Sequence, residues 1–178
     1  MTSAESPVQL ALIDAGLGEK SLTSSLCTHA AEASDPATMQ VTRFSAGDHH
    51  ILPYGEPGVS GVQELTQTLQ AAEGVILVFP VYNFNMNATL KAIIEHGGPA
   101  MAGKGVGLMA SAGGRHAYMS FASAIQGLMF DLRCWIVPRQ VYALGEDFTE
   151  GRLSNQDVLR RVGELVAATA DMAHRLRR

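Results

Sequence analysis

The sequence predicts an open α/β fold, in which a parallel sheet is covered by helices on both faces. Strand-like and helical segments alternate along the whole chain, and parallel strands need helical crossovers of this kind. The chain has 178 residues, of which 47% are hydrophobic and 17% charged. That length and composition predict one domain, residues 1–178, which buries its own core without disulfides or metal.

The first two strands and the first two helices follow in order. Residues 8–13 form a short apolar run, which is typical of a buried strand, and residues 20–33 have helical character. Residues 39–44 alternate apolar and polar side chains, which predicts a second strand. After a long loop rich in Gly, Pro and Asp, residues 62–72 place their apolar side chains on one face of a helix.

The middle of the chain contains the most strand-like segment, residues 74–79. We expect this third strand to end at Pro80, because proline has no N–H to donate to a strand ladder. Residues 87–96 have apolar side chains at helical spacing, residues 105–110 predict a fourth strand, and residues 116–132 predict a long apolar helix. The third and fourth strands are therefore each followed by a helix.

The last third of the chain completes the alternation. Residues 134–137 and 141–144 together predict a fifth strand that Pro138 interrupts. Residues 154–178 are amphipathic and predict a final helix. We expect Ser154 to cap it, with Asp157 at its third position.

Five strands and five helices in this order predict a flavodoxin-like, doubly wound five-stranded parallel sheet with strand order 2-1-3-4-5. The dinucleotide-binding form of the doubly wound fold uses a sixth strand and fits less well.

Composition excludes several classes of function. The net charge of −4 provides no basic field for DNA or RNA. The longest apolar run, residues 74–80, is too short to span a bilayer, and residues 1–7 lack the features of a signal peptide. Cys27 and Cys134 are the two cysteines, and neither has a CxxC partner. We therefore expect no zinc site, no disulfide framework and a cytoplasmic location.

Ligands of open α/β sheets lie beyond the carboxyl ends of the strands, so the loops there are the candidate site. The first (loop one, residues 14–21) leads into a helix N-terminus that can hold a phosphate. It is not a P-loop, because Glu19 stands where a glycine must precede the lysine, and it lacks the third glycine of a dinucleotide fingerprint. A plain strand-to-helix turn remains the alternative. The candidate contacts are Gly16, Gly18, Lys20, Ser21 and Thr23.

The second candidate loop (loop two, residues 80–87) follows the third strand. Tyr82 and Phe84 offer flat surfaces, and the asparagines at 83, 85 and 87 offer amides that could bind the edge of a heterocycle. The alternative is an Asn-rich turn whose two aromatic rings fold onto the core. The candidate binding residues are Pro80, Tyr82, Asn83, Phe84 and Asn85.

The third candidate loop (loop three, residues 111–116) contains Ser111 and the pair Gly113-Gly114. Two glycines let the backbone lie flat against a ligand, and the helix behind them presents free N–H groups. Arg115 is placed to meet a nucleotide phosphate, unless it is only a solvated residue at the start of the helix. A simple two-glycine turn is the alternative for the loop as a whole.

Together the three loops resemble the NADPH-dependent FMN reductase family over residues 8–148, most strongly over residues 73–132. Pro80-x-Tyr82-Asn83 followed by Leu90-Lys91-x-x-Ile94 resembles the family's PxYN…LKxxID segment, and residues 111–114 resemble its second flavin loop. The family's first loop reads GSxRxxS. Here Gly16 stands in place of its serine and Gly18 in place of its arginine, whereas Ser21 is retained.

The resemblance implies an oxidoreductase that transfers hydride from NADPH or NADH to FMN, and then to free flavin, a quinone or another acceptor. Its phosphate would lie at loop one and its isoalloxazine ring between loops two and three. Hydride transfer needs stacked rings and no side-chain acid or base, so we expect no catalytic residue in the strict sense. Without the family's arginine, FMN should bind weakly, which suits delivery of reduced flavin to a partner such as a flavin-dependent monooxygenase.

The resemblance also implies a homodimer or homotetramer, and the apolar helix at residues 116–132 agrees with it. No metal is expected, because the adjacent His49 and His50 have no acidic or cysteine partner nearby. Three other functions stay open to different degrees: a flavodoxin-type electron carrier, a degenerate nucleotide- or partner-binding module, and a signalling receiver domain. The receiver domain is disfavoured, because Phe79-Pro80 stands where it needs an aspartate.

Overall fold

A computed structural model describes residues 6–18 and 21–177. In that part of the chain, the central sheet has the order β2-β1-β3-β5-β6, with β7 also beside β5 and β4 beside β3. Leaving aside β4, which is only one arm of a hairpin, this order is the predicted 2-1-3-4-5. The strands of the sheet are β1 (Val8–Asp14), β2 (Met39–Ser45), β3 (Gly74–Tyr82), β4 (Asn85–Met86), β5 (Gly105–Ala112), β6 (Trp135–Ile136) and β7 (Val141–Leu144).

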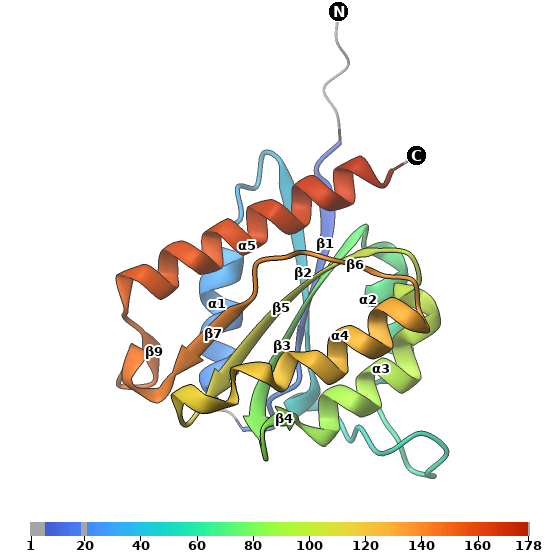
Figure 1. The fold of residues 1–178 in the computed structure, drawn as a ribbon. Helices are drawn as coiled ribbons and strands as arrows, with labels where there is room; N and C mark the ends of the chain where they lie inside the picture. The colour runs from blue at the N-terminus through green and yellow to red at the C-terminus, as the bar shows by residue number, and fades with distance from the viewer. Residues whose placement is uncertain (1–5, 19–20, 178) are drawn as a thin grey trace, which may run out of the picture.

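Helices cover both faces of this sheet, as predicted (Figure 1). One hydrophobic core lies between the sheet and α2, α3 and α4, and a second lies between the sheet and α1 and α5. The helices are α1 (Leu22–Glu32), α2 (Val62–Ala71), α3 (Ala88–Met101), α4 (Phe121–Phe130) and α5 (Gln156–Arg175), with short 3-10 segments η1 (Ala46–Asp48), η2 (Arg115–Ser120) and η3 (Gly145–Asp147). None of the described helices is long and apolar enough to cross a membrane.

The third strand does not end at Pro80, contrary to the prediction. β3 continues to Tyr82, and Pro80 still pairs with Ser111 of β5. The pairing of β3 with β1 ends at Val78. Beyond that point one side of β3 is an edge, where a residue without an N–H is tolerated.

Two predicted helices have different bounds. α3 runs on to Met101 through Gly97, Gly98 and Pro99. The two glycines let neighbouring side chains pack close to the helix. A Cβ on Gly97 would lie 2.5 Å from Leu69 Cδ1. The long helix expected at residues 116–132 is instead η2 followed by α4, and the backbone at Ala117 is not helical.

The C-terminal helix is capped by Asn155 and not by Ser154. Asn155 Oδ1 accepts hydrogen bonds from the N–H groups of Asp157 and Val158, at 2.9 and 3.4 Å. The Ser154 hydroxyl instead donates to the carbonyl of Asp147 at 3.3 Å. The sequence pattern was correct in type and one residue out in register, because both residues are good N-caps.

The fifth strand is split as predicted, and a further hairpin precedes the last helix. β6 and β7 both pair in parallel with β5, on either side of Pro138. β8 (Phe148–Thr149) and β9 (Arg152–Leu153) form a separate antiparallel hairpin that the sequence analysis did not anticipate.

Candidate functional site

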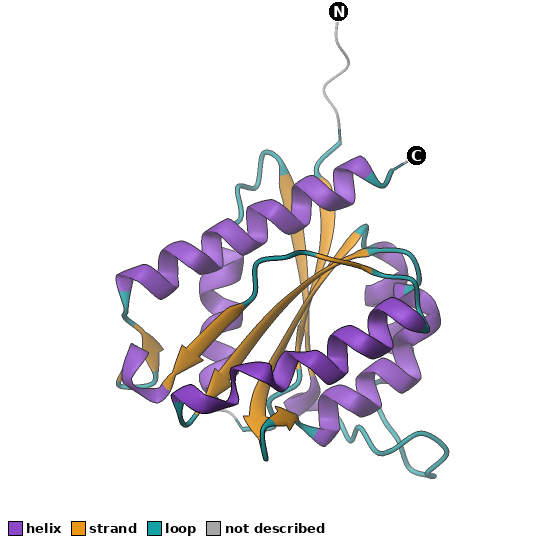
Figure 2. Cartoon of the chain, viewed as in Figure 1, coloured by secondary structure: helices purple, strands orange, loops and turns teal. Residues whose placement is uncertain are grey.

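The three candidate loops lie at one edge of the sheet. The arrowheads of the long strands point to this edge in Figure 2, because β1, β3 and β5 are parallel neighbours. The carboxyl ends of parallel strands meet at the same edge of a sheet, so loops far apart in the sequence become adjacent there. This grouping agrees with the sequence analysis.

A buried aspartate shapes loop one. Asp14, at the end of β1, is 2% exposed. Its Oδ1 accepts the N–H of Gly16 at 3.0 Å, and its Oδ2 accepts Nη2 of Arg43 at 2.9 Å. The same Arg43 nitrogen donates to the hydroxyl of Ser24 at 2.9 Å. The charge of Asp14 is therefore paired, and the residue does not act as a free anion facing a ligand.

Arg43 lies beside loop one, and the sequence analysis did not identify it. It lies on β2, which pairs with β1, and Phe44 beside it faces the core. The signal was available: in the order 2-1-3, the end of the second strand must lie beside the loop that follows the first. A basic residue near that end was a candidate for that reason.

The hydroxyls of loop one form a compact cluster at the start of α1. Ser21 caps the helix, its Oγ accepts the N–H of Thr23, and the two hydroxyl oxygens are 2.6 Å apart. Thr23 is fully buried, so it supports Ser21 from inside. A Cβ on Gly16 would lie 2.2 Å from Thr23 Oγ1, whereas one on Gly18 would meet no atom within 4 Å. Lys20 and Glu19 lie outside the described residues.

Loop two is the turn of a tight hairpin. Val81 pairs with Met86, and Tyr82 with Asn85, so Asn83 and Phe84 form a two-residue connection between β3 and β4. Both have positive φ, 49° and 61°, as a type I′ turn requires. Asparagine tolerates this conformation, but for phenylalanine it is strained.

The side chains of loop two divide into exposed and structural ones. Tyr82 and Phe84 are 62% and 69% exposed, so neither ring folds onto the core. Asn87 is buried, caps α3 by accepting the N–H of Leu90, and donates Nδ2 to the carbonyl of Ala15 at 2.8 Å. Asn87 therefore ties loop two to loop one.

The asparagine at position 85 also serves the fold. Its Oδ1 accepts the N–H of Met86 at 2.8 Å and the hydroxyl of Ser123 on α4. The amide oxygen is thus occupied within the protein. Of the loop-two asparagines, Asn83 is the one that faces a groove.

Loop three has open space beside its glycines. A Cβ on Gly113 or Gly114 would meet no atom within 4 Å, so neither glycine is required by packing inside the protein. The carbonyl of Gly114 accepts a hydrogen bond from the hydroxyl of Tyr142 on β7, which fixes the loop. Arg115 pairs with Glu146 at the surface, and Ser111 is buried at the end of β5.

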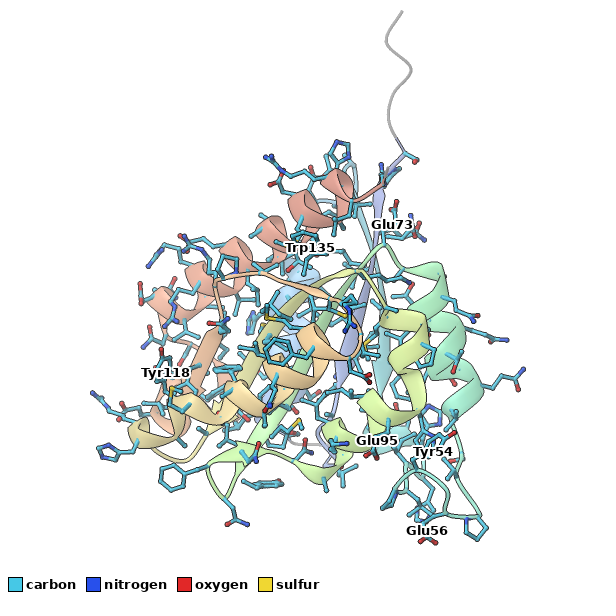
Figure 3. The ribbon with its side chains drawn as sticks, turned by 45° about the vertical axis from the view of Figure 1, so that its right-hand side comes forward. Tyr54, Glu56, Glu73, Glu95, Tyr118 and Trp135 are labelled. Carbon is cyan, nitrogen blue, oxygen red and sulfur yellow. The ribbon has the colours of Figure 1, made fainter. Side chains whose placement is uncertain are left out.

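Loops two and three enclose a groove of about 360 Å³, which we call the ring groove. It is open to solvent at the carboxyl ends of the strands. Pro80 and Tyr82, two of the predicted binding residues, do not line it. Figure 3 shows Tyr118 on the adjoining η2 segment, at the outer edge of the molecule. The lining residues are Val81, Asn83, Phe84, Ala112, Gly113, Gly114, His116 and Ala117.

The ring groove suits a flat heterocycle. Its glycines leave room for close approach of a ring, its aliphatic and aromatic side chains offer apolar contact, and its backbone offers N–H donors. Among the described residues, no three His, Cys, Asp or Glu side chains gather as a metal site would require. His49 instead stacks on Phe44, with ring centroids 4.9 Å apart. Its Nε2 lies 3.5 Å from Oε2 of Glu64, so His49 has an acidic neighbour that the sequence analysis did not expect.

The two cysteines have no reactive character. Burial raises the pKa of the Cys27 thiol well above its ordinary value, and nearby Asp14 raises it further. Burial likewise raises the pKa of Cys134 to about 11. Both thiols stay protonated at neutral pH, so nucleophilic chemistry by a thiolate is not expected.

Comparison with known proteins agrees with this geometry. The family described as NADPH-dependent FMN reductase matches residues 8–149. No curated protein sequence matches the chain significantly. The fold is similar to that of an oxidoreductase from Corynebacterium diphtheriae, at 23% identity and a TM-score of 0.71, with 93% of this chain and 98% of that chain covered.

Two further structures have the same fold. One is the apo form of the NADH:FMN oxidoreductase EmoB, at 18% identity and a TM-score of 0.73, with 92% of this chain and 88% of that chain covered. The other is FerB from Paracoccus denitrificans, a flavoenzyme NAD(P)H:(acceptor) oxidoreductase, at 16% identity and a TM-score of 0.74, with 94% and 98% covered. The family match spans most of the chain and includes all three loops. The chain belongs to the NADPH-dependent FMN reductase family and is an oxidoreductase that uses FMN and a reduced nicotinamide nucleotide.

Proposed function

We propose that this single domain binds FMN along the carboxyl edge of its sheet, with the phosphate at loop one and the isoalloxazine ring in the ring groove. Hydride would pass from NADPH or NADH to FMN and then to an acceptor such as free flavin or a quinone. The ring groove carries this proposal. It lies between the two loops that resemble flavin loops, and glycines whose Cβ positions are empty form part of its wall.

At the ring end, the chain would supply shape and backbone donors. Gly113 and Gly114 admit the ring edge, and their N–H groups can meet charge that develops on it during reduction. Asn83 and Phe84 form the opposite wall. The hydrogen bond from Tyr142 to Gly114 holds the loop in place before any ligand arrives, which reduces the entropy lost on binding.

At the phosphate end, the chain offers fewer contacts than its family pattern suggests. Ser21 presents a hydroxyl backed by Thr23, but the N–H of Gly16 is already donated to Asp14. We therefore expect FMN to dissociate readily. A dissociable flavin suits an enzyme that hands reduced flavin to another protein, such as a flavin-dependent monooxygenase.

The reaction needs no side-chain acid or base in this site. FMN supplies the hydride acceptor and the electron relay, so the protein's part is to stack the two rings and exclude water. Arg115, exposed at the start of η2, is available to the phosphates of the nicotinamide nucleotide when its surface pair with Glu146 opens. Surface pairs of this kind are weak, so the exchange costs little.

A glycine substitution tests the ring groove directly. Gly114 has an extended backbone that any residue can adopt, and a Cβ there meets no protein atom. Gly114→Val should therefore fold normally and fill the groove. We expect FMN and riboflavin to lose affinity equally, by about tenfold or more, because both carry the same ring. Gly145→Val is the matched control, since Gly145 also has free space but lies outside the groove.

Fluorescence titration of the apoprotein measures both affinities. Unchanged flavin binding in Gly114→Val would refute the ring placement. Steady oxidation of NADPH in the presence of FMN or a quinone separates an enzyme from a one-electron carrier, and the absence of turnover in a sample that binds FMN would refute the reductase activity.

We also propose a homodimer or homotetramer. Met119, Met129 and Phe130 on and before α4 are 67%, 44% and 72% exposed, which is unusual for large apolar side chains in a monomer. Light scattering at micromolar concentration checks the mass, and a monomer there would contradict the proposal. The two buried free thiols support a cytoplasmic location.

A further inference from the structure

A second polar groove lies beside loop one, between α1 and the β8–β9 hairpin, and we call it the α1 groove. Its volume is about 490 Å³. Four hydroxyls from one face of α1 line it, beginning with the helix cap, so it is continuous with loop one. Figure 1 shows the orange hairpin beside the lower part of blue α1. The lining residues are Ser21, Ser24, Ser25, Thr28, His29, Glu150, Gly151 and Arg152.

The hairpin is fastened to α1 at the residue next to Arg152. The N–H of Leu153 donates to the hydroxyl of Ser25 at 2.9 Å, and the Leu153 side chain is buried in the core against α1 and α5. Successive residues of a strand point to opposite faces. Because Leu153 points inward, Arg152 lines the groove.

The base of the hairpin is also held in place. Both carboxylate oxygens of Asp147 are hydrogen-bonded at 2.7 Å, one to Asn155 Nδ2 and the other to the N–H of Leu144. At the tip, Glu150 and Gly151 have φ of 50° and 79°, the conformation that a two-residue hairpin turn needs. Arg152 is therefore presented by a rigid element.

The guanidinium of Arg152 has no carboxylate partner in the described part of the chain. Within residues 6–18 and 21–177, its guanidinium has neither an ion pair nor a side-chain hydrogen bond. By contrast, Arg43 and Arg115 pair with Asp14 and Glu146. A guanidinium beside serine hydroxyls is a suitable donor set for a phosphate group, which accepts from both. The hydroxyls of Ser24 and Ser25 accept hydrogen bonds from Arg43 and Leu153 and can still donate, whereas that of Thr28 already donates to the carbonyl of Ser24 at 3.0 Å.

The cavity on the other side of loop one is less suitable for an anion. It is lined by the carboxylates of Asp14, Asp48 and Glu64, by the guanidinium of Arg43, and by His49, whose imidazole lies beside Glu64. The α1 groove has one lining carboxylate, Glu150, against Arg152, and its His29 is paired with Glu32 at 3.0 Å. The charge balance therefore favours the α1 groove.

We propose that the α1 groove is a phosphate subsite and that Arg152 is its cation, in place of the arginine missing from loop one. Arg152 lies beyond residue 149, where the family match ends. The inference rests on the proposed function. Two molecules of this reaction carry the phosphate that the groove would bind: FMN, and the nicotinamide nucleotide.

The test is Arg152→Gln in the full chain, titrated with FMN and with riboflavin by fluorescence. We expect FMN to bind about tenfold more weakly and riboflavin to be unaffected, because riboflavin has the ring without the phosphate. Arg152→Lys should recover part of the loss. Arg175→Gln removes the same charge from the far end of α5 and should change neither affinity.

A second set of titrations, with NADPH, NADH and 2′,5′-ADP, shows whether the groove binds the phosphate of FMN or that of the nicotinamide nucleotide. If FMN binding is unchanged, and binding of NADPH and 2′,5′-ADP weakens while that of NADH does not, the groove holds the nucleotide phosphate and the proposal stands. If no phosphorylated probe weakens, or riboflavin weakens as much as FMN, the proposal is overturned. Failure of the proposed function looks different: Gly114→Val would then leave flavin binding intact whatever Arg152→Gln does.

Discussion

At the scale of single residues, loop one differs from its family pattern at Gly16 and Gly18, and the structure gives a packing reason for the glycine at position 16 alone. Gly16 is enclosed by the hydroxyls of Ser21 and Thr23 and by Asp14, so a larger residue would displace the helix cap. Gly18 faces open space. A serine at position 16 would thus collide with the cap and the buried carboxylate, whereas nothing in the described structure prevents an arginine at position 18.

The substitution Gly18→Arg should therefore restore a charge-assisted contact to the FMN phosphate. We expect FMN affinity to rise about tenfold, mainly through slower release, and riboflavin affinity to stay the same. Fluorescence titration and stopped-flow release measure both. Gly16→Ser is the contrasting variant, which should lower the free energy of unfolding because its Cβ collides with Thr23 Oγ1.

Two results would contradict this prediction. An equal gain for riboflavin would mean that the new arginine acts on the ring or the fold. FMN that is already tightly held by the unmodified protein would mean that the groups at loop one and the α1 groove suffice.

At the scale of elements, the sequence predicts the long strands and helices well and the short hairpins poorly. Apolar runs such as residues 74–79 and the face of α5 carry a periodicity that specifies element and face. The β3–β4 turn has no glycine at Phe84, where a type I′ turn favours one. Asn85, which follows the turn, accepts a hydrogen bond from Ser123 on α4, a tertiary contact that a local pattern does not contain.

The same distinction applies to the site. Loops two and three were identifiable because Tyr82, Asn83 and Gly113-Gly114 are distinctive neighbours in the sequence. Arg43 and Arg152 carry no such local pattern. The predicted strand order already places the end of β2, and so Arg43, beside loop one. Arg152 reaches the α1 groove only through a hairpin anchored on Ser25, which no sequence pattern indicated.

Relieving the strained turn of loop two should make the protein more stable but weaken its binding of flavin. Phe84 has φ of 61°, a conformation that costs a non-glycine residue about 1–2 kcal/mol. Phe84→Gly should raise the free energy of unfolding by about 0.5–1 kcal/mol, after the greater flexibility of glycine in the unfolded chain is subtracted. It should also weaken FMN and riboflavin several-fold, because Phe84 lines the ring groove.

Urea unfolding and flavin titration measure the two effects. Asn83→Gly is the control, with a smaller gain in stability, since asparagine already tolerates positive φ. A loss of stability in Phe84→Gly would show that the exposed ring contributes more to the fold than its backbone costs.

At the scale of the whole molecule, the edge of the sheet opposite the site is closed by an ion-pair cluster. The carboxylate of Glu73 receives Nε and Nη2 of Arg177 and, at 2.8 Å, the N–H of Gln9. Arg177 also donates to the carbonyl of Ser6 at 3.1 Å. The cluster joins the start of β1, the start of β3 and the end of α5. Figure 3 shows Glu73 at the end of the molecule from which the termini emerge.

This cluster should make stability depend on acid pH. The hydrogen bonds from Arg177 lower the pKa of Glu73, so the folded state favours the carboxylate. The resulting stability is present above the ordinary pKa of glutamate and is lost as pH falls through the lowered pKa. Between about pH 5 and pH 3, the free energy of unfolding should therefore fall less steeply in Glu73→Gln than in the wild type.

Urea unfolding at a series of pH values measures the two slopes. FMN affinity at neutral pH should not change in Glu73→Gln, because the cluster lies at the edge opposite the loops. Identical slopes in the two proteins would contradict the assignment.

The interruption of the fifth strand at Pro138 affects how the protein behaves at high concentration. An unbroken edge strand offers a row of free N–H and C=O groups to which a strand from another molecule can add, and this is a route to aggregation. Here the edge beside β5 consists of β6, with two residues, and β7, with four. Proline between them removes a donor and bends the chain. The break leaves no continuous template along that margin, so the protein should tolerate crowding and refolding better than a version with a straight fifth strand.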